Sequence, residues 1–120
     1  MIVGIGTDLI EIERVRKACE REAFLLRVYT ENERRQAGKN IARLAGDFAV
    51  KEAVAKVFGT GFREFGPLDI EVLRDELGKP RVKLYGKAEI RSEHLGIRAL
   101  HVSISNTDSH VLAFAVGEGD

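Results

Sequence analysis

The spacing of apolar residues predicts a strand and then a helical segment at the start of the 120-residue chain. Ile and Val alternate with small residues over 1–8, which is typical of a short buried strand, and we expect this strand to end near Thr7. Residues 9–29 then have helical spacing, and we expect this helix to break near Glu22.

Two further helices are predicted from their capping residues. Thr30 and Glu33 match a capping box, which predicts a short helix that ends at Gly38. Asn40 can cap a longer helix over 41–58, which a second glycine would end.

After residue 60 the apolar period changes from helical to alternating. Leu68, Ile70 and Val72 fall on one face of a predicted strand, and the turn sequence ELGKP leads into a returning strand. The remaining predicted elements are a helix over 86–96 and two strands over 98–105 and 110–117. The last strand is apolar on both faces, which suits a central strand or a subunit interface. The order β-ααα-ββ-α-ββ predicts one α+β domain over 1–120, with a small, mainly antiparallel sheet packed with a long buried helix.

Composition narrows the class of protein. The chain has 19 basic and 19 acidic side chains, so it lacks the basic excess that is typical of nucleic-acid binders. With one cysteine, Cys19, it can form neither an intrachain disulfide nor a cysteine-based zinc cluster. The first residues lack the basic flank of a signal peptide, and no apolar run approaches the roughly 20 residues of a membrane span. We therefore expect a cytoplasmic protein that binds neither nucleic acid nor membrane.

The long predicted helix carries apolar residues on nearly every side, which is typical of a buried helix. Arg43, Asp47 and Lys51 form a separate polar row with i,i+4 spacing, and we interpret this row as a solvated edge. Glu52 and Lys56 fall among the apolar positions instead. Because an isolated buried carboxylate is too costly, Glu52 must be paired, protonated or bound to a metal.

Two interpretations of Glu52 remain open from its position alone. It can form an internal i,i+4 ion pair with Lys56, or it can bind a metal while Lys56 faces an anion. A metal site needs a second acid, and Asp8 at the predicted end of the first strand is the candidate. Alternatively, Asp8 and Glu11 form an N-capping pair for the first helix. Magnesium typically takes one or two carboxylates and completes its coordination with water and phosphate oxygens.

Other candidate motifs do not form recognisable sites. Gly4 and Gly6 do not begin a dinucleotide fingerprint, because the position of its third glycine is Leu9. The histidines lack zinc-ligand spacing, and we interpret them as ordinary surface or interface residues; they are His94, His101 and His110.

Four segments together resemble a known family. GIGTDLIEIERV near the start, FAVKEAVAKVFGTG in the middle, and LGKP and VSISNT later in the chain are similar to holo-[acyl-carrier-protein] synthase, the small, single-repeat phosphopantetheinyl transferase family. The resemblance implies transfer of the 4′-phosphopantetheine arm of coenzyme A to a serine of an apo acyl carrier protein, with release of adenosine 3′,5′-bisphosphate. It also implies magnesium as the cofactor and a homotrimer with active sites between subunits. The carrier protein could serve fatty-acid or polyketide synthesis.

The resemblance also implies roles for individual residues. Asp8 and Glu52 would hold the metal on the coenzyme A diphosphate. Lys56 would face the same diphosphate and, as a catalytic residue, stabilise charge on the leaving bisphosphate. Either Glu52 or a water on the metal could accept the serine proton. Three residues of the turn, Gly78, Lys79 and Pro80, would lie near the nucleotide of coenzyme A; from sequence alone they require only a hairpin turn.

This chain departs from the family at three positions, of which Phe48, where many members have Trp, is a mild packing change. Asn106 stands where the family usually has a histidine that contacts the 3′-phosphate of the nucleotide across the subunit interface. An amide donates hydrogen bonds but carries no charge, so this contact should be weaker or come from another residue. Asp47 stands where we expect a basic residue in some relatives, which places a second phosphate contact in question.

The first helical segment offers a surface for the carrier protein. Arg14, Lys17 and Arg21 fall on one side of a helix, and the resemblance implies that this side docks the acidic helix of the carrier. Alternatively the surface is an ordinary solvated charged face, because several acids are nearby: Glu13, Glu20 and Glu22. Two other functions remain as alternatives to the transferase: a magnesium-dependent phosphodiesterase that uses the same acids, and a non-catalytic binding module.

Overall fold

The computed structural model describes all 120 residues, and its elements follow the predicted order. The strands are β1 Ile2–Glu11, β2 Ile70–Arg74, β3 Pro80–Leu84, β4 Ala99–Asn106 and β5 His110–Glu118. The helices are α1 Ile12–Cys19, α2 Glu22–Val28, α3 Glu31–Ala37, α4 Ile41–Phe58 and α5 Gly86–His94, and a single 3-10 turn, Pro67–Asp69, precedes β2. The first helical segment does break, and it forms the separate helices α1 and α2. The predicted α+β class is confirmed.

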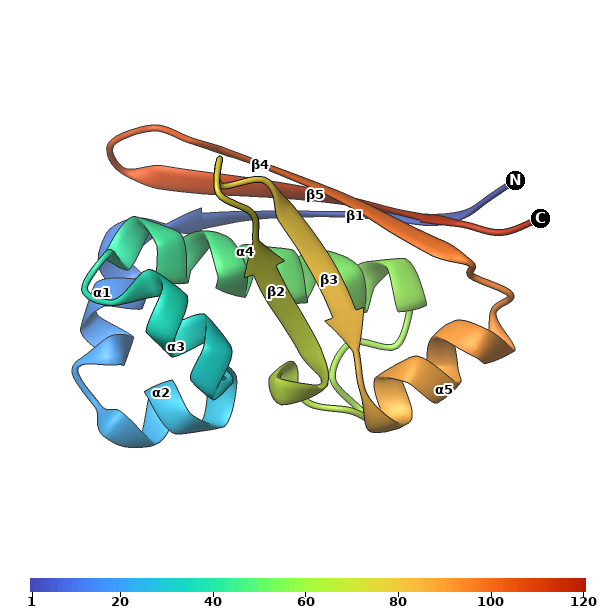
Figure 1. Cartoon of the computed structure of the whole chain (residues 1–120), viewed down its shortest axis with the longest axis horizontal. Coiled ribbons are helices and arrows are strands. Elements are labelled where there is room, and N and C mark those ends of the chain that lie inside the picture. The colour runs from blue at the N-terminus through green and yellow to red at the C-terminus, as the bar shows by residue number, and fades with distance from the viewer.

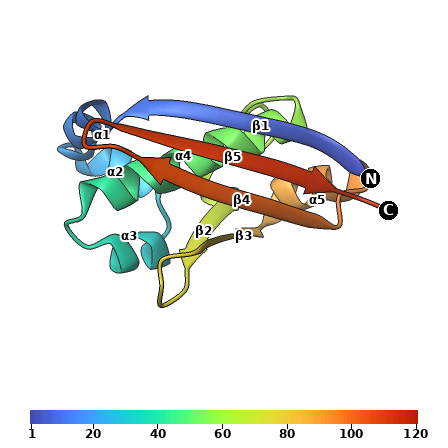
Figure 2. The same ribbon diagram turned by 90° about the horizontal axis from the view of Figure 1, so that it is seen from above.

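Helix α4 lies at the centre of a layered arrangement. The three-stranded antiparallel sheet has the order β1-β5-β4, so the last strand is central, which is one of the two interpretations of its apolar faces. Helix α4 runs along one face of this sheet, while α1–α3, the two-stranded β2–β3 hairpin and α5 lie on the other side of α4 (Figure 1). The outer face of the sheet is uncovered (Figure 2). None of the helices is both long and apolar enough to cross a membrane.

Local capping explains where the helices begin and end. The Asn40 side chain accepts a hydrogen bond from Arg43 N at 3.0 Å, and α4 ends at Gly59, whose φ of 77° lies in the left-handed region. Thr30 and Glu33 form the predicted capping box at the start of α3. These bonds satisfy backbone N–H groups that have no partner within the helix.

Two glycines in β1 allow the strand to lie directly on α4. A Cβ atom at Gly6 would overlap the carbonyl oxygen of Ala53, and one at Gly4 would lie 2.8 Å from the carbonyl oxygen of Val57. The GIG sequence is therefore a close-packing feature of a strand. It fixes the side chains that follow in β1 against the middle of α4.

The predicted solvated row on α4 is wrong. Asp47 and Lys51 are buried, and the Lys51 side chain is 0% exposed. Lys51 Nζ lies 2.9 Å from Glu33 Oε1 of α3 and donates to the carbonyl oxygens of Pro67 and Ile70. The sheet covers one side of α4, while α3 and β2 cover the other. Asp47 and Lys51 therefore meet ion partners from distant parts of the chain instead of water.

Two strand boundaries also differ from those predicted. Strand β1 continues past Thr7 to Glu11, because residues 8–11 keep pairing with β5 down to His110. Leu68 is not on the strand with Ile70 and Val72 but in the 3-10 turn, where it is exposed. The proline and the Asp69 carboxylate, which accepts from Gly66 N, favour that turn over an extended backbone.

Candidate active site

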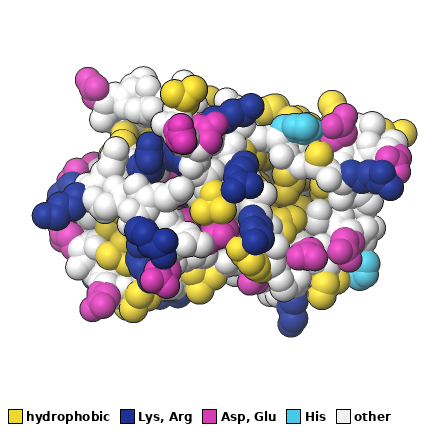
Figure 3. Space-filling model, in the orientation of Figure 1, with side chains coloured by type: hydrophobic (Ala, Val, Ile, Leu, Met, Phe, Trp, Pro, Cys, Tyr) yellow, Lys and Arg dark blue, Asp and Glu magenta, His cyan; other side chains and the backbone are white.

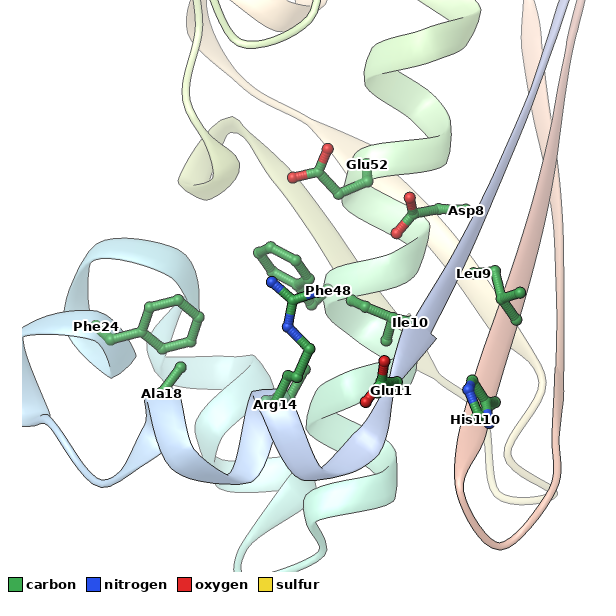
Figure 4. Close-up of a pocket in the computed structure, with 11 residues that line it drawn as sticks. Asp8, Leu9, Ile10, Glu11, Arg14, Ala18, Phe24, Phe48, Glu52 and His110 are labelled. Carbon is green, nitrogen blue, oxygen red and sulfur yellow. The ribbon is translucent and has the colours of Figure 1, made fainter.

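A cleft of about 410 Å³ opens between the end of β1 and helices α1, α2 and α4. It has an acidic end with Asp8 and Glu52, a basic side with Arg14, and an apolar floor (Figure 4). The remaining lining residues are Leu9, Ile10, Glu11, Val15, Ala18, Phe24, Phe48 and His110.

Asp8 and Glu52 share the acidic end of the cleft. Asp8 points from β1 to the same side as Gly6 and Ile10, toward α4, and Glu52 lies on the facing surface of α4 (Figure 4). Burial is the main cause that raises the pKa of both carboxyls, and the Asp8 charge raises the pKa of Glu52 further. The two acids thus form a partly desolvated pair of like charges, which a cation would stabilise.

Lys56 stands beside this pair, on the turn of α4 that follows Glu52. Its Nζ donates to the carbonyl oxygen of Thr7 at 2.8 Å and lies 3.5 Å from Asp8 Oδ1. The side chain is 55% exposed, so the ammonium group is accessible to solvent. No ion pair joins Glu52 to Lys56, and the internal-pair interpretation of these two residues is wrong because Lys56 crosses to β1 instead.

The alternative role of Asp8 as a helix cap is also wrong. Helix α1 begins after Glu11, and no side chain caps its N-terminus. Asp8 is instead three residues inside the strand, opposite Ala113. Its carboxylate is therefore free to face the cleft.

The donor set limits what kind of cation the cleft could hold. No group of three or more His, Cys, Asp or Glu side chains lies close enough to bind a metal ion by itself. Asp8 and Glu52 offer two carboxylates, which is the number that Mg²⁺ takes where water and phosphate oxygens complete its octahedron. Two carboxylates in an open cleft suit a metal ion that enters together with a phosphate ligand. They suit less well a metal ion that is bound by protein side chains alone.

The other residues predicted to contact coenzyme A lie at the opposite edge of the sheet. Strand β1 forms one edge and β4, which ends at Asn106, forms the other. The turn that contains Gly78, Lys79 and Pro80 projects on the β4 side (Figure 2). One chain therefore brings Asp8, Glu52 and Lys56 together but does not bring them to the turn or to Asn106.

The predicted docking surface borders the cleft. Arg14 lines the cleft, and Lys17 is exposed one turn later on α1. Arg21 lies beyond the end of α1, directly before α2, so it does not belong to the same helical face. Glu13 and Glu20 both pair with Arg16, at 2.6 and 2.9 Å, so neither forms an ion pair with Arg14 or Lys17.

Comparison with known proteins identifies the family. A family model described as the 4′-phosphopantetheinyl transferase superfamily matches residues 4–115. The chain belongs to this superfamily. The resemblance seen in the four sequence segments is thereby confirmed.

The relatives of this transferase match it over nearly their whole length. A holo-[acyl-carrier-protein] synthase of Lachnoclostridium phytofermentans is 57% identical over 118 residues, which cover 98% of this chain and 97% of the relative. The crystal structure of the holo-[acyl-carrier-protein] synthase from Neisseria meningitidis has a TM-score of 0.89 and 38% identity, covering 98% of this chain and 99% of that one. The Bacillus anthracis enzyme in complex with coenzyme A (3′,5′-ADP) has a TM-score of 0.82 and 38% identity, with coverage of 100% and 99%.

Sequence reasoning missed part of the cleft of this transferase. Phe24 and Phe48 form its apolar floor, with ring centroids 6.1 Å apart, and His110 of β5 closes the end beside β1. Phe48 stands one turn before Glu52 on α4, and this spacing could have indicated that the two residues share the face that lines the cleft. Nothing in the spacing of Phe24 or His110 distinguishes a cleft residue from a core or surface residue.

Proposed function

We propose that this chain transfers the 4′-phosphopantetheine group of coenzyme A to a serine of apo acyl carrier protein and releases adenosine 3′,5′-bisphosphate. The observation that carries the proposal is the Asp8–Glu52 pair beside Lys56, in a cleft bordered by the basic side of α1. Its relatives support it, since they are named holo-[acyl-carrier-protein] synthases and one solved relative is a coenzyme A complex. The whole chain, residues 1–120, would act as one transferase domain in the cytoplasm.

We assign the metal site to Asp8 and Glu52, with Mg²⁺ as the ion. A bound Mg²⁺ neutralises charge on the diphosphate of coenzyme A, and phosphoryl transfer depends mostly on positioning and charge neutralisation. Lys56, held over the edge of β1 by Thr7 and Asp8, places an ammonium group next to the same diphosphate. Glu52, whose pKa is raised by burial and by Asp8, is our choice for the group that accepts the serine proton.

The uncovered sheet face supports a homotrimer. Ile5 and Leu9 of β1 are 60% and 66% exposed, and Leu112 and Phe114 of the adjacent β5 are exposed beside them. A contiguous apolar face of this kind marks an interface. Subunits arranged around it would bring the acids at the β1 edge of one chain to the turn and Asn106 at the β4 edge of the next. The active site would then lie between subunits.

The trimer is tested by sedimentation velocity. We expect the wild-type protein to sediment as a trimer and Phe114→Glu to sediment as a monomer with little transferase activity. Ile90→Glu, which changes another exposed apolar residue, on α5, is the matched control and should remain trimeric. A wild-type monomer with full activity would exclude the shared site.

The carrier protein would dock on the surface formed by Arg14, Lys17 and Arg21. Arg14 belongs to both the docking surface and the cleft, so a carrier helix bound there would place its serine near Asp8 and Glu52. Charges at such a rim mostly accelerate encounter and fix register.

Intact mass spectrometry of an apo acyl carrier protein tests the reaction directly. We expect incubation with this protein, coenzyme A and Mg²⁺ to add one phosphopantetheine to the carrier, and we expect EDTA to prevent the addition. Glu52→Gln should lower the rate at least about 100-fold while the fold survives. Release of phosphopantetheine to water without a modified carrier would instead identify a phosphodiesterase, and no reaction with several carriers would favour a binding module.

A further inference from the structure

Helix α1 carries two cations that can reach the same two acids. Glu13 stands three residues before Arg16 and four before Lys17. Glu20, directly after the helix, stands four residues after Arg16 and three after Lys17. Side chains three or four positions apart are neighbours on the surface of a helix. Each acid can therefore pair with either Arg16 or Lys17.

Both acids pair with Arg16 in the structure. Nε and Nη2 of Arg16 donate to the two carboxylate oxygens of Glu13, at 2.9 and 2.6 Å, and Nη1 donates to Glu20 Oε1 at 2.9 Å. The planar guanidinium group spans both carboxylates with donors in a fixed fork, which a lysine ammonium group does not offer. Lys17 is exposed and takes no part in an ion pair within the chain.

Lys17 is nevertheless close enough to these acids to compete for them. The hydrogen bond from Arg16 is the main cause that lowers the pKa of Glu13, and the charge of Lys17 lowers this pKa further. An acid placed four residues before a lysine is also the favourable order for an ion pair on a helix. Without Arg16, Glu13 and Glu20 would pair with Lys17.

The place of Lys17 beside the cleft makes this competition relevant to binding. Basic and acidic side chains are interspersed over the helices (Figure 3), so cations in this part of the molecule commonly have an acid within reach. Arg14, three residues before Lys17, lines the cleft (Figure 4) and has no ion pair either. Helix α1 thus offers two free cations at the border of the cleft to an acidic partner.

We propose that Arg16 is a positioning residue for carrier recognition, which holds Glu13 and Glu20 and so keeps Lys17 free for a carboxylate of the carrier protein. This inference rests on the proposed function, because it takes an acidic carrier docked on α1 as the partner. Arg16 needs no contact with the carrier itself. If Arg16 were lost, the carrier would meet one free cation on α1, Arg14, in place of two.

A double-mutant cycle on transfer to an apo acyl carrier protein at low salt tests the proposal. In the wild-type background we expect Lys17→Gln to raise the KM for the carrier about fourfold, while kcat and the affinity for coenzyme A change by less than about twofold. In the Arg16→Gln background the same change should raise this KM by less than about 1.5-fold, because Glu13 and Glu20 already occupy Lys17. An equal effect of Lys17→Gln in the two backgrounds would overturn the assignment.

Removing the two acids separates the proposed role of Arg16 from a merely structural one. Adding Glu13→Gln and Glu20→Gln to Arg16→Gln should restore the roughly fourfold effect of Lys17→Gln on KM, because no acid is left to hold Lys17. If the loss of Arg16 simply damaged helix α1, the effect of Lys17→Gln would not return, and the assignment would be wrong.

Two further variants complete the test. Arg35→Gln, the matched control, removes an exposed arginine of α3 that pairs with Glu31 at 3.7 Å, and it should leave the effect of Lys17→Gln at the wild-type value. Arg16→Lys serves if α1 loses helicity in Arg16→Gln. A lysine cannot span both acids, so the effect of Lys17→Gln on KM should fall below its wild-type value in this background, and an unchanged effect would contradict the proposal.

The wild-type result separates this inference from the proposed function. A wild-type protein that modifies the carrier, while Lys17→Gln has the same effect with and without Arg16, would overturn only the role of Arg16. A wild-type protein that modifies no carrier in the presence of coenzyme A and Mg²⁺ would overturn the proposed function and this inference with it.

Discussion

Replacing Lys51 by Met should destabilise the protein severely, although the residue touches no ligand. Lys51 Nζ interacts with Glu33 Oε1 at 2.9 Å and with the carbonyl oxygens of Pro67 and Ile70 at 2.8 and 2.6 Å. Met fills a similar volume but leaves the Glu33 carboxylate buried with only two donors, the backbone N–H groups of Thr30 and Val72. Breaking one side of a buried ion pair costs about 3–5 kcal/mol.

The desolvation cost of the buried Lys51 reduces the destabilisation expected from Lys51→Met. Burial lowers the pKa of Lys51, so the wild-type protein already carries a desolvation cost that Met removes. We therefore expect Lys51→Met to lower the free energy of unfolding by about 3 kcal/mol, the lower end of that range. This corresponds to a fall in melting temperature of roughly 10 °C.

Thermal unfolding at pH 7, at matched protein concentrations, measures this loss. Lys87→Met, an exposed lysine on α5 without an ion pair, is the control and should change the melting temperature by less than about 2 °C. The double variant Glu33→Gln with Lys51→Met should recover about half of the loss, because no buried charge is then left unpaired. If Lys51→Met alone lowered the melting temperature by less than about 3 °C, the argument that the Lys51–Glu33 pair stabilises the fold would be refuted.

Three further predictions follow from other residues. Burial raises the pKa of Asp47 to about 6, so between about pH 4 and 6 this carboxyl ionises in the unfolded chain while it stays largely protonated in the native protein, and the free energy of unfolding falls as pH rises. Asp47→Asn should remove this fall, up to about 3 kcal/mol, from urea titrations at different pH, and an unchanged slope would contradict the burial argument. Arg14→Glu should slow carrier modification about 10-fold at low salt and spare coenzyme A affinity; equal loss of both would exclude docking there. Asn106→His should tighten binding of coenzyme A several-fold near pH 6 without affecting 3′-dephospho-coenzyme A, and calorimetry with the two ligands measures it.

The helix ends were predictable because caps are local. The Thr30–Glu33 box and the Asn40 cap each join residues three apart, so a short stretch of sequence contains the whole interaction. For β5 the apolar pattern allowed a central strand or an interface, and it could not distinguish the two; the structure makes β5 central while one of its faces is exposed.

The environment of α4 was not predictable from its own sequence. Lys51 and Glu52 are adjacent, yet Lys51 is enclosed by α3 and β2 while Glu52 borders an open cleft. Periodicity identifies the faces of a helix but not the elements that cover them, and Lys51 meets a partner 18 positions earlier in the chain, Glu33. Asp8 and Glu52, paired in the sequence analysis, do line one cleft, while Asp47 and Lys51 were assigned to solvent and are buried.

The contact between Gly6 and Ala53 has a consequence for ion selectivity. Because the backbones of β1 and α4 approach closely there, main-chain packing sets the distance between the two backbones that carry Asp8 and Glu52. A methyl group at position 6 would have to lift the strand, and Asp8, two residues later, would move with it. If Asp8 and Glu52 hold the proposed ion, the ionic radius that they accept would be set by a residue that touches no ion, and Gly6→Ala should shift preference from Mg²⁺ toward larger divalent cations.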